Sequence, residues 1–306
     1  NFHDMWGVFF MLKNKSQKVT DVYEAFILDR KSRRFKSGTL QTYKDRILPF
    51  VNWCDSNTVF CLSDITPTVI RTYLTQLQDK NLASQTIHGI AIAIQSFFNW
   101  LVKEELLKES PMKKVAIPKA DKKILPAFTQ EDITKLLKNT NTERDEAIIL
   151  FLLDSGARAT ELLNLTGGDI DMKTGIVTIR QGKGSKDRIV YIGNKTRKQL
   201  LRYYMERGTP KENEKVWLSE TKGTPLTNTG LSQFLKKLGI KIDVKNCSPH
   251  TFRRTFALNS LRNGMSIYHL QRLMGHEDIT VLKQYLALSQ NDLQAAHVQH
   301  GVVDNL

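Results

Sequence analysis

A proline- and lysine-rich segment divides this 306-residue chain into two parts. Between Pro111 and Pro126 the sequence carries three prolines and five lysines and shows no helical period. Prolines at this density favour a semi-extended chain, because each fixes its own φ and restricts the residue before it. Lysines suit a segment that crosses a phosphate backbone, although a plain solvated linker has the same composition. The expected organisation is an extension over residues 1–12, a domain over 13–110, a linker over 111–127 and a second domain over 128–306.

The first part has the apolar period of a helical domain. Apolar residues recur three and four positions apart behind four helix-start signals, at Thr20, Thr39, Thr66 and Ser84. Pro49 falls inside the second of these segments, where we expect a kink. The fourth helix is the longest and is expected to reach about Leu107. Because the connections are short, the pattern predicts a small helical bundle.

In the second part, the spacing of apolar residues changes from helical to strand-like and back to helical. A capping-box-like start at Thr129 opens helical segments that stop near Gly156, and a short helix is expected over residues 158–164. Three short segments with β-branched residues follow, joined by glycine-containing turns, over residues 170–172, 176–179 and 188–192. Helical segments return over about 194–207, 227–238, 249–263, 266–274, 279–287 and from 291. The expected fold class is mainly α with a small antiparallel β-sheet (α+β).

Positive charge is spread over the whole chain. The formal net charge is +14. Divided near Leu125, the N-terminal part has 19 Lys and Arg against 12 Asp and Glu, and the C-terminal part has 26 against 19. A shared basic excess favours a polyanionic partner, because neutralised phosphates release their counterions. Nucleic acid fits this balance, and so does a basic protein that is merely soluble.

The cysteines and the apolar runs bear on the compartment. Cys54, Cys61 and Cys247 form neither a CxxC pair nor a disulfide framework, which favours a reducing cytoplasm. No apolar run reaches the roughly 18–20 residues of a membrane span. No acidic cluster has the spacing of a metal site, so no metal and no cofactor are expected.

An arginine and a lysine in the second part have the chemistry to bind a phosphate. Arg158 follows a glycine break after an apolar helix, and Glu161 lies three residues further on, where its carboxylate can hold the guanidinium group. Lys183 stands between two glycines at the tip of the expected hairpin, where an ammonium group can enter a DNA groove or act as an acid. A surface ion pair and a plain turn are the ordinary readings of these two features.

Further candidates lie toward the C-terminus. Ser248-Pro249 is a helix start that puts His250 and Arg253 on one face, near the positive end of the helix dipole. His276 follows Gly275 at a helix end, and Tyr285 lies nine residues later. Taken singly, such a His-x-x-Arg pair is usually solvated, such a histidine is more often a cap, and such a tyrosine is by default a core residue. Taken together, two arginines, two histidines and a tyrosine are the groups needed to attack a phosphodiester with a phenol.

The ordered motifs resemble those of the tyrosine recombinases, the phage-integrase and Xer-like site-specific recombinases. The strings are Gly-Ala-Arg-Ala-Thr-Glu-Leu-Leu, Gly-Lys-Gly-Ser-Lys-Asp-Arg, Pro-His-Thr-Phe-Arg-Arg-Thr-Phe-Ala and Leu-Met-Gly-His-Glu-Asp-Ile-Thr, with Tyr285 after them. The resemblance runs from about Phe128 to the C-terminus and is weaker over the N-terminal helices, which look like the family's core-binding domain. The matching catalytic positions are Arg158 with its supporting Glu161, Lys183, His250, Arg253, His276 and the nucleophile Tyr285.

The resemblance implies a metal-free transesterification. Tyr285 would attack a DNA phosphate, form a 3′-phosphotyrosyl link and free a 5′-hydroxyl group. The two arginines and His276 would stabilise the charge on the phosphate in the transition state. His250 would accept the phenolic proton, and Lys183 would protonate the departing oxygen. The link keeps the energy of the ester, so rejoining needs no cofactor.

The resemblance also implies how the protein assembles. The tail from Leu288 to Leu306 would dock into a neighbouring subunit and give a tetramer on two DNA sites; docking on its own domain is the alternative. Accessory proteins are possible further partners, and a membrane is not expected. The positions expected to face DNA are Lys44, Gln85, His88, Lys113, Lys114, Lys122 and Lys123.

Two other functions stay open at this point. A type IB-like DNA topoisomerase shares the same chemistry and relaxes any supercoiled DNA, but the size and compact linker favour a recombinase. A non-cleaving DNA-binding relative would not need all six catalytic positions, and all six are filled. Whether the outcome is integration, excision or resolution does not follow from the residues.

Overall fold

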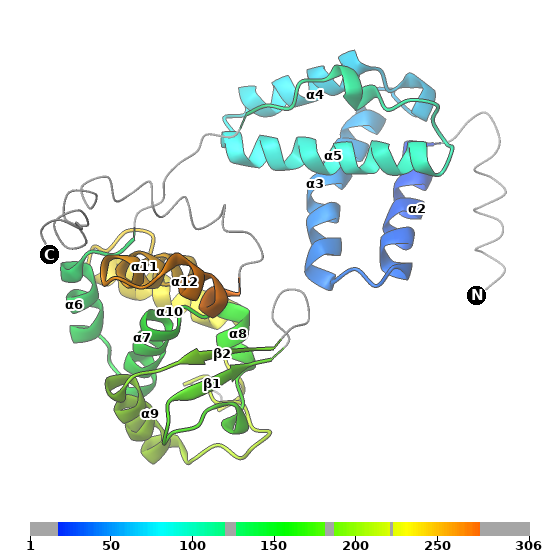
Figure 1. The fold of residues 1–306 in the computed structure, drawn as a ribbon. Coiled ribbons are helices and arrows are strands. Elements are labelled where there is room, and N and C mark those ends of the chain that lie inside the picture. The colour runs from blue at the N-terminus through cyan, green and yellow to red at the C-terminus, as the bar shows by residue number, and fades with distance from the viewer. Residues whose placement is uncertain (1–17, 120–126, 181–186, 221–222, 276–306) are drawn as a thin grey trace, which may run out of the picture. The chain divides into compact units, whose positions relative to one another are not determined.

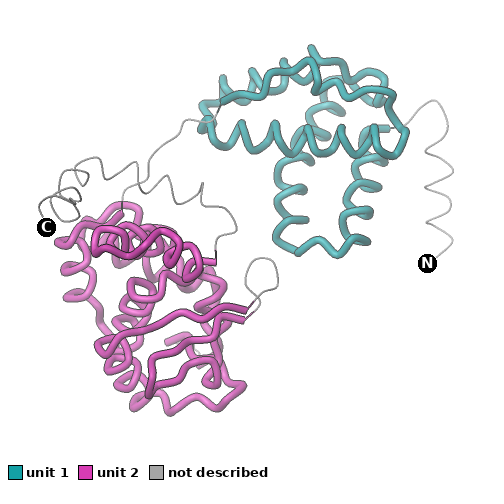
Figure 2. Tube along the Cα trace, in the orientation of Figure 1, with its two compact units in different colours: residues 1–123 teal, residues 124–306 magenta. Residues whose placement is uncertain are grey.

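The chain divides into two compact units, residues 1–123 and residues 124–306 (Figure 2). The computed structural model describes residues 18–119, 127–180, 187–220 and 223–275, and these carry every structural statement that follows. Helices dominate both units, and the described residues hold one small sheet, of two antiparallel strands. The expected α+β class is therefore confirmed. The residue limits expected for the domains and the linker stay predictions, and residues 1–12 lie outside the described part.

Unit 1 consists of two helix pairs, and Figure 1 shows α5 running across α2 and α3. Three rings meet the ring of Phe26 edge-on at centroid distances of 5.2–5.4 Å, those of Tyr43, Phe97 and Trp100. This aromatic cluster joins α2, α3 and α5 into one core. The elements of unit 1 are α2 (Val19–Ser32), α3 (Ser37–Ser56), η1 (Leu62–Asp64), α4 (Pro67–Asp79), α5 (Ser84–Lys103) and η2 (Pro111–Lys114).

Of the helix starts expected at Thr20, Thr39, Thr66 and Ser84, only Thr66 provides a capping side chain. Thr66 caps α4 as expected, since its Oγ1 accepts from the backbone N–H of Val69. The other three helices begin next to Lys18, Lys36 and Ala83, whose side chains make no capping hydrogen bond. Helix α3 runs on through Pro49. Helix α5 ends at Lys103, before the expected end near Leu107, because the chain turns at Glu105, which has a φ of 60°.

The first half of the expected linker is part of unit 1. Met112 and Val115 are buried in the core of this unit. Arg71 donates to the carbonyl of Lys114, and His88 Nδ1 lies 2.8 Å from the carbonyl oxygen of Pro118. A carbonyl can only accept, so Nδ1 carries the proton. Residues 111–118 thus form a short 3-10 helix and a bound segment, where a semi-extended strap was expected.

Unit 2 packs helices around α7, which contacts both α9 and α11. In the two-stranded sheet, Ile176 faces Tyr191 and Ile179 faces Arg188. Threonine or serine caps begin α6, α7, α10 and α11, at Thr129, Thr142, Thr227 and Ser248. The elements are α6 (Gln130–Lys138), α7 (Glu143–Ser155), α8 (Ala159–Asn164), η3 (Gly167–Asp169), β1 (Ile176–Ile179), β2 (Arg188–Tyr191), α9 (Asn194–Arg207), α10 (Asn228–Lys241), α11 (Pro249–Arg262) and α12 (Ile267–Met274).

The third strand expected over residues 170–172 does not form. Ile170 makes a single isolated bridge with Val177. The carboxylate of Asp171 then accepts from the backbone N–H groups of Lys173 and Thr174 and turns the chain. This turn leads into β1 before a second ladder pair can form, so the prediction was wrong in length.

Three further observations concern the cysteines, membrane spans and metal sites. Cys54, Cys61 and Cys247, all within the described residues, form no disulfide bond. Among the described residues, no helix is both long and apolar enough to cross a membrane, and no group of three or more His, Cys, Asp or Glu side chains could hold a metal ion.

Candidate active site

Three arginines from three different elements bind the C-terminal end of α12. The Nε atom of Arg188 donates to the carbonyl of Leu273 at 2.8 Å. The next carbonyl, of Met274, accepts from Arg253 Nη2 at 2.6 Å, and the one after it, of Gly275, accepts from Arg158 Nη2 at 3.4 Å. The last carbonyls of a helix have no intrahelical partner and carry the negative end of its dipole. The last carbonyl groups of α12 therefore bring the three guanidinium groups together.

Arg253 joins the end of α12 to the end of α7. It lies on α11, which Ser248 caps and Pro249 opens. Its side chain is buried, and its Nη1 donates to the carbonyl of Gly156 at 2.6 Å. Gly156 ends α7 with a φ of 59°, and a Cβ atom there would lie 2.2 Å from the ring of Phe256. Only glycine fits this position, so the glycine break before Arg158 also places an acceptor for Arg253.

Arg158 and Glu161 are in contact as expected. Arg158 is the N-cap of α8, and its backbone N–H donates to Glu161 Oε2 at 2.7 Å. Its Nη1 donates to Glu161 Oε1, also at 2.7 Å. The carboxylate is buried, whereas the Arg158 side chain keeps 23% of its surface exposed. Among the described residues, its Nε–H has no acceptor, so this guanidinium retains donors for an anion.

Arg188 also contacts this site, and the sequence had given it no role. Its Nη1 and Nη2 donate to the two oxygens of Glu161 at 2.7 and 2.8 Å, in a bidentate pair. It opens β2, and its side chain is 10% exposed. A signal was present in the sequence. With a period of two, Arg188 shares the face of buried Val190, while Ile189 and Tyr191 are exposed. An arginine on an inward strand position requires a buried acceptor.

The charge of Glu161 is fixed by its two arginines. Burial raises the pKa of this carboxyl group, but the hydrogen bonds from Arg188 and from the backbone and side chain of Arg158 outweigh it and lower the pKa to about 2. Glu161 is therefore ionised at neutral pH. Three positive groups and one carboxylate make up the arginine cluster, defined here as Arg158, Arg188, Arg253 and Glu161. Its excess positive charge suits a phosphate.

His250 lies at the start of α11, one helical turn before Arg253. Its side chain is exposed and makes no hydrogen bond within the described part of the chain. The position next to the N-terminus of α11 suits an anion, because the helix dipole is positive there. Lys183, His276 and Tyr285 lie outside the described residues. The roles expected for all six catalytic residues and for Glu161 stay predictions.

Comparison with known proteins decides the family. The model of the phage integrase family matches residues 126–292, more than half of the chain. The model of the phage integrase N-terminal SAM-like domain matches residues 22–108. The chain belongs to the phage integrase family. Both structural units thus have counterparts in this family, and the resemblance seen in the motifs is confirmed.

Curated relatives of this integrase-family protein are tyrosine recombinases. XerC of Bacillus pumilus is 28% identical over 281 residues, covering 88% of this chain and 92% of the relative. XerC of Thermodesulfovibrio yellowstonii is 30% identical over 262 residues, covering 81% and 85%. XerA of Saccharolobus solfataricus is 29% identical over 287 residues, covering 91% and 92%. The protein is accordingly a tyrosine-type site-specific recombinase, and the comparisons favour this class over a topoisomerase.

Solved structures share the fold of this integrase-family protein. The Tn1549 transposon integrase in complex with a circular intermediate DNA has a TM-score of 0.74 at 17% identity, covering 92% of this chain and all of the neighbour. A lambda integrase dimer bound to a core site has a TM-score of 0.73 at 17% identity, covering 89% and 77%.

The residues expected to face DNA have varied surroundings. Lys44 and Gln85 are exposed on α3 and α5. His88 is half-buried and binds the carbonyl of Pro118, so its Nδ1–H serves the bound linker segment. Lys113 is exposed and pairs with Glu109 at 3.5 Å, and Lys114 is exposed. Lys122 and Lys123 lie outside the described residues.

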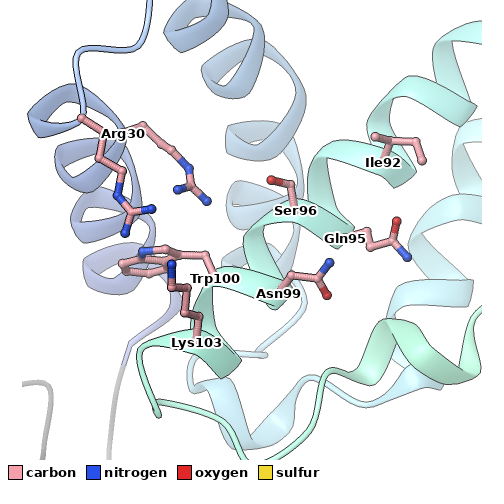
Figure 3. A pocket seen from close by; sticks show the side chains of 8 residues that line it. Arg30, Ile92, Gln95, Ser96, Asn99, Trp100 and Lys103 are labelled. Atoms are coloured by element: carbon pink, nitrogen blue, oxygen red, sulfur yellow. The ribbon is translucent and has the colours of Figure 1, made fainter.

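A groove with a volume of about 350 Å³ lies beside α5 in unit 1 (Figure 3). Arg30 on α2 and Arg33, the residue after this helix, line it and both pair with Asp29. Among the described residues, the amide side chains of Gln95 and Asn99 make no hydrogen bond. We call this surface the α5 groove; its lining residues are Arg30, Arg33, Ile92, Gln95, Ser96, Asn99, Trp100 and Lys103.

Proposed function

We propose that this recombinase cuts and rejoins DNA strands through a covalent 3′-phosphotyrosyl intermediate on Tyr285. The observation that supports the proposal is the arginine cluster. Arg158 and Arg253 donate to adjacent carbonyls of one helix end, so their guanidinium groups lie close together. Arg158 is partly exposed, and His250 is exposed on the face of α11 that carries Arg253.

The proposed chemistry is an in-line exchange of two oxygens on one phosphorus atom. The Tyr285 oxygen forms a bond to phosphorus while the bond to the 5′-oxygen breaks. His250 takes the phenolic proton, and Lys183 gives a proton to the departing oxygen. Arg158, Arg253 and His276 stabilise the negative charge of the pentacoordinate transition state. Rejoining reverses each step, so the number of phosphate ester bonds is the same before and after the reaction.

The assembly proposed for this reaction is a tetramer on two recombination sites. Identical protomers readily exchange terminal elements, and the tail from Leu288 onward is the candidate for exchange. A variant ending at Ala287 should bind a single site but fail to join two sites into one complex, as measured by mass photometry on DNA. A tetramer that forms without the tail would contradict the exchange.

The α5 groove is proposed to take part in reading the DNA sequence. Amides such as Gln95 and Asn99 can pair with adenine through two hydrogen bonds in the major groove. The arginines and Lys103 at its edge suit contacts with phosphates. In this proposal, unit 1 recognises the DNA sequence through the α5 groove, and unit 2 binds the reacting phosphate through the arginine cluster.

The central experiment traps the covalent intermediate. A binding site is first selected from random duplexes with the purified protein, and a nicked version of it is then incubated with the enzyme. A denaturing gel should show a protein–DNA adduct, and mass spectrometry should map it to the peptide that holds Tyr285. Tyr285→Phe should abolish the adduct and keep DNA binding. An adduct that persists in this variant would falsify the assignment of the nucleophile.

A further inference from the structure

We propose that Arg188 is a positioning residue of the recombination reaction, which holds Glu161 so that Glu161 orients the guanidinium group of Arg158 toward the phosphate. This inference rests on the proposed function, since it concerns the rate of the same strand cleavage. Arg188 ends the motif Gly-Lys-Gly-Ser-Lys-Asp-Arg, but the expected catalytic set does not include it.

All three nitrogen groups of the Arg188 guanidinium are engaged within the protein. Nη1 and Nη2 bind the two oxygens of Glu161, and Nε binds the carbonyl of Leu273. The side chain is 10% exposed. Three of the five N–H donors of Arg188 are therefore engaged, one on each nitrogen, and the bidentate pair with Glu161 is the route by which we infer that it acts on a phosphate.

The contact with Glu161 decides where Arg158 points. Each carboxylate oxygen of Glu161 accepts one bond from Arg188 and one from Arg158. A carboxylate held at both oxygens cannot rotate without breaking two charge-assisted bonds. Glu161 is thereby a fixed anchor for the Arg158 side chain, and Arg158 Nη2 is left to reach Gly275.

Arg188 also ties together three segments that carry predicted catalytic residues. It opens β2, which follows Lys183 in the sequence, it binds α8 through Glu161, and it binds the end of α12 shortly before His276 in the sequence. The packing there is tight, because a Cβ atom on Gly275 would lie 2.9 Å from Cδ of Arg188. A change at Arg188 should therefore alter the geometry of the predicted site, and its effect on stability is measured separately as Tm.

The structure offers a matched control on the same hairpin. Arg180 follows β1 and donates through Nε to Asp169, which is buried. This pair has the same chemistry, an arginine on a buried carboxylate, but no hydrogen bond of Arg180 reaches Glu161 or α12 within the described residues. The Arg180 side chain is 63% exposed and that of Arg188 is 10% exposed, so Arg180→Met controls for the loss of an arginine–carboxylate pair on this hairpin, and the difference in stability is measured separately.

The test measures single-turnover cleavage of the nicked duplex from pH 5 to pH 9 for the wild type, Arg188→Met, Arg188→Lys and Arg180→Met. Arg188→Met should cleave about 10- to 100-fold more slowly, by analogy with the loss when the outer partner of a metal ligand is removed. Arg188→Lys keeps the charge without the fork and should recover part of the rate. DNA binding and Tm are measured alongside for each variant.

The dependence of the cleavage rate on pH distinguishes a positioning role of Arg188 from a role in stability alone. In the wild type, burial and the two arginines set the charge of Glu161; the described groups that face it are Arg158 and Arg188. Burial raises the pKa of Glu161, and without Arg188 fewer hydrogen bonds counteract this effect, so the pKa rises. The cleavage rate of Arg188→Met should therefore fall more steeply toward acidic pH than the wild-type rate. Arg180→Met should keep the wild-type profile.

A double variant completes the test. If Arg188 acts through Glu161, then Arg188→Met combined with Glu161→Gln should lose little more rate than Glu161→Gln alone. Additive losses, or a loss in Arg188→Met that follows Tm with an unchanged pH profile, would overturn the inference. Failure of the wild type itself to form an adduct would instead reject the proposed function. Should Arg188→Met not fold, the Arg188→Lys profile decides in the same way.

Discussion

Arg253 Nη1 donates a 2.6 Å hydrogen bond to the carbonyl oxygen of Gly156, across a sequence separation of 97 residues. The bond connects the helix that carries a predicted catalytic pair to the glycine that ends α7 just before Arg158. One glycine thus determines the positions of both arginines that are expected to hold the phosphate.

Gly156→Ala should disrupt this junction. The φ of 59° is strained for alanine, and the added Cβ would lie 2.2 Å from a ring carbon of Phe256. We expect a loss of about 3 kcal/mol or more in the free energy of unfolding, measured by urea denaturation. Gly223→Ala is the control, because its φ of 60° nearly equals that of Gly156 but nothing lies within 4 Å of the added atom. Equal losses in the two variants would show that the contact with Phe256 is unimportant.

Glu161→Gln should change how stability depends on pH. The folded protein holds the pKa of Glu161 at about 2, below its ordinary value of 4.5. A lowered folded-state pKa gives stability that is present above the unfolded-state pKa and is lost as pH falls toward the folded one. The gap in unfolding free energy between wild type and Glu161→Gln should therefore narrow by on the order of 2 kcal/mol between pH 7 and pH 3. A gap independent of pH over this range would refute the ionised, arginine-held carboxylate.

Met112→Ala should destabilise unit 1, although the residue lies in the expected linker. Its side chain is almost fully buried in the aromatic core. Truncation of such a methionine costs about 2–5 kcal/mol, and denaturation of the full chain should show this loss in the transition of unit 1. The neighbouring Lys113→Ala, at an exposed position, should change stability by less than about 0.5 kcal/mol. If the two variants are alike, residues 111–118 are not bound to the unit in solution.

Variants of the α5 groove should distinguish sequence-specific DNA binding from binding through positive charge. Gln95→Ala and Asn99→Ala should weaken binding to the selected site by about 1–3 kcal/mol each and leave binding to random DNA nearly unchanged. Lys103→Ala should weaken both and reduce the salt slope of log K by about one. Lys80→Ala removes an equal charge outside the groove. Fluorescence anisotropy at several salt concentrations measures all four variants, and equal effects of Lys80→Ala and Lys103→Ala would contradict a role of the groove.

Local signals in the sequence were enough to find most helices. The caps at Thr66, Thr129 and Ser248 act within one helical turn, so they can be read without knowledge of the fold. The ends that were misjudged depend on conformations that the period does not reveal. The turn at Glu105 shortened α5, and the carboxylate of Asp171 turned the chain where a third strand was expected.

The candidate site was predictable in its motifs and not in its contacts. The spacing of Arg158 and Glu161 indicated their pairing, because both lie on one helical turn. Arg188 is 27 residues from Glu161, and His88 is 30 residues from Pro118, so both partners depend on the tertiary fold. For Arg188 the inward position on β2 was a usable sign that a buried acceptor exists.

The end of α12 offers three neighbouring peptide groups, and each holds one arginine. These acceptors belong to a single helical turn, so they cannot move independently. If that turn unwinds or rotates, all three cations lose a backbone support at once; if it forms, all three gain one. Assembly of the positive cluster is therefore cooperative, and the same peptide turn sets the starting point of the chain that leads on to Tyr285.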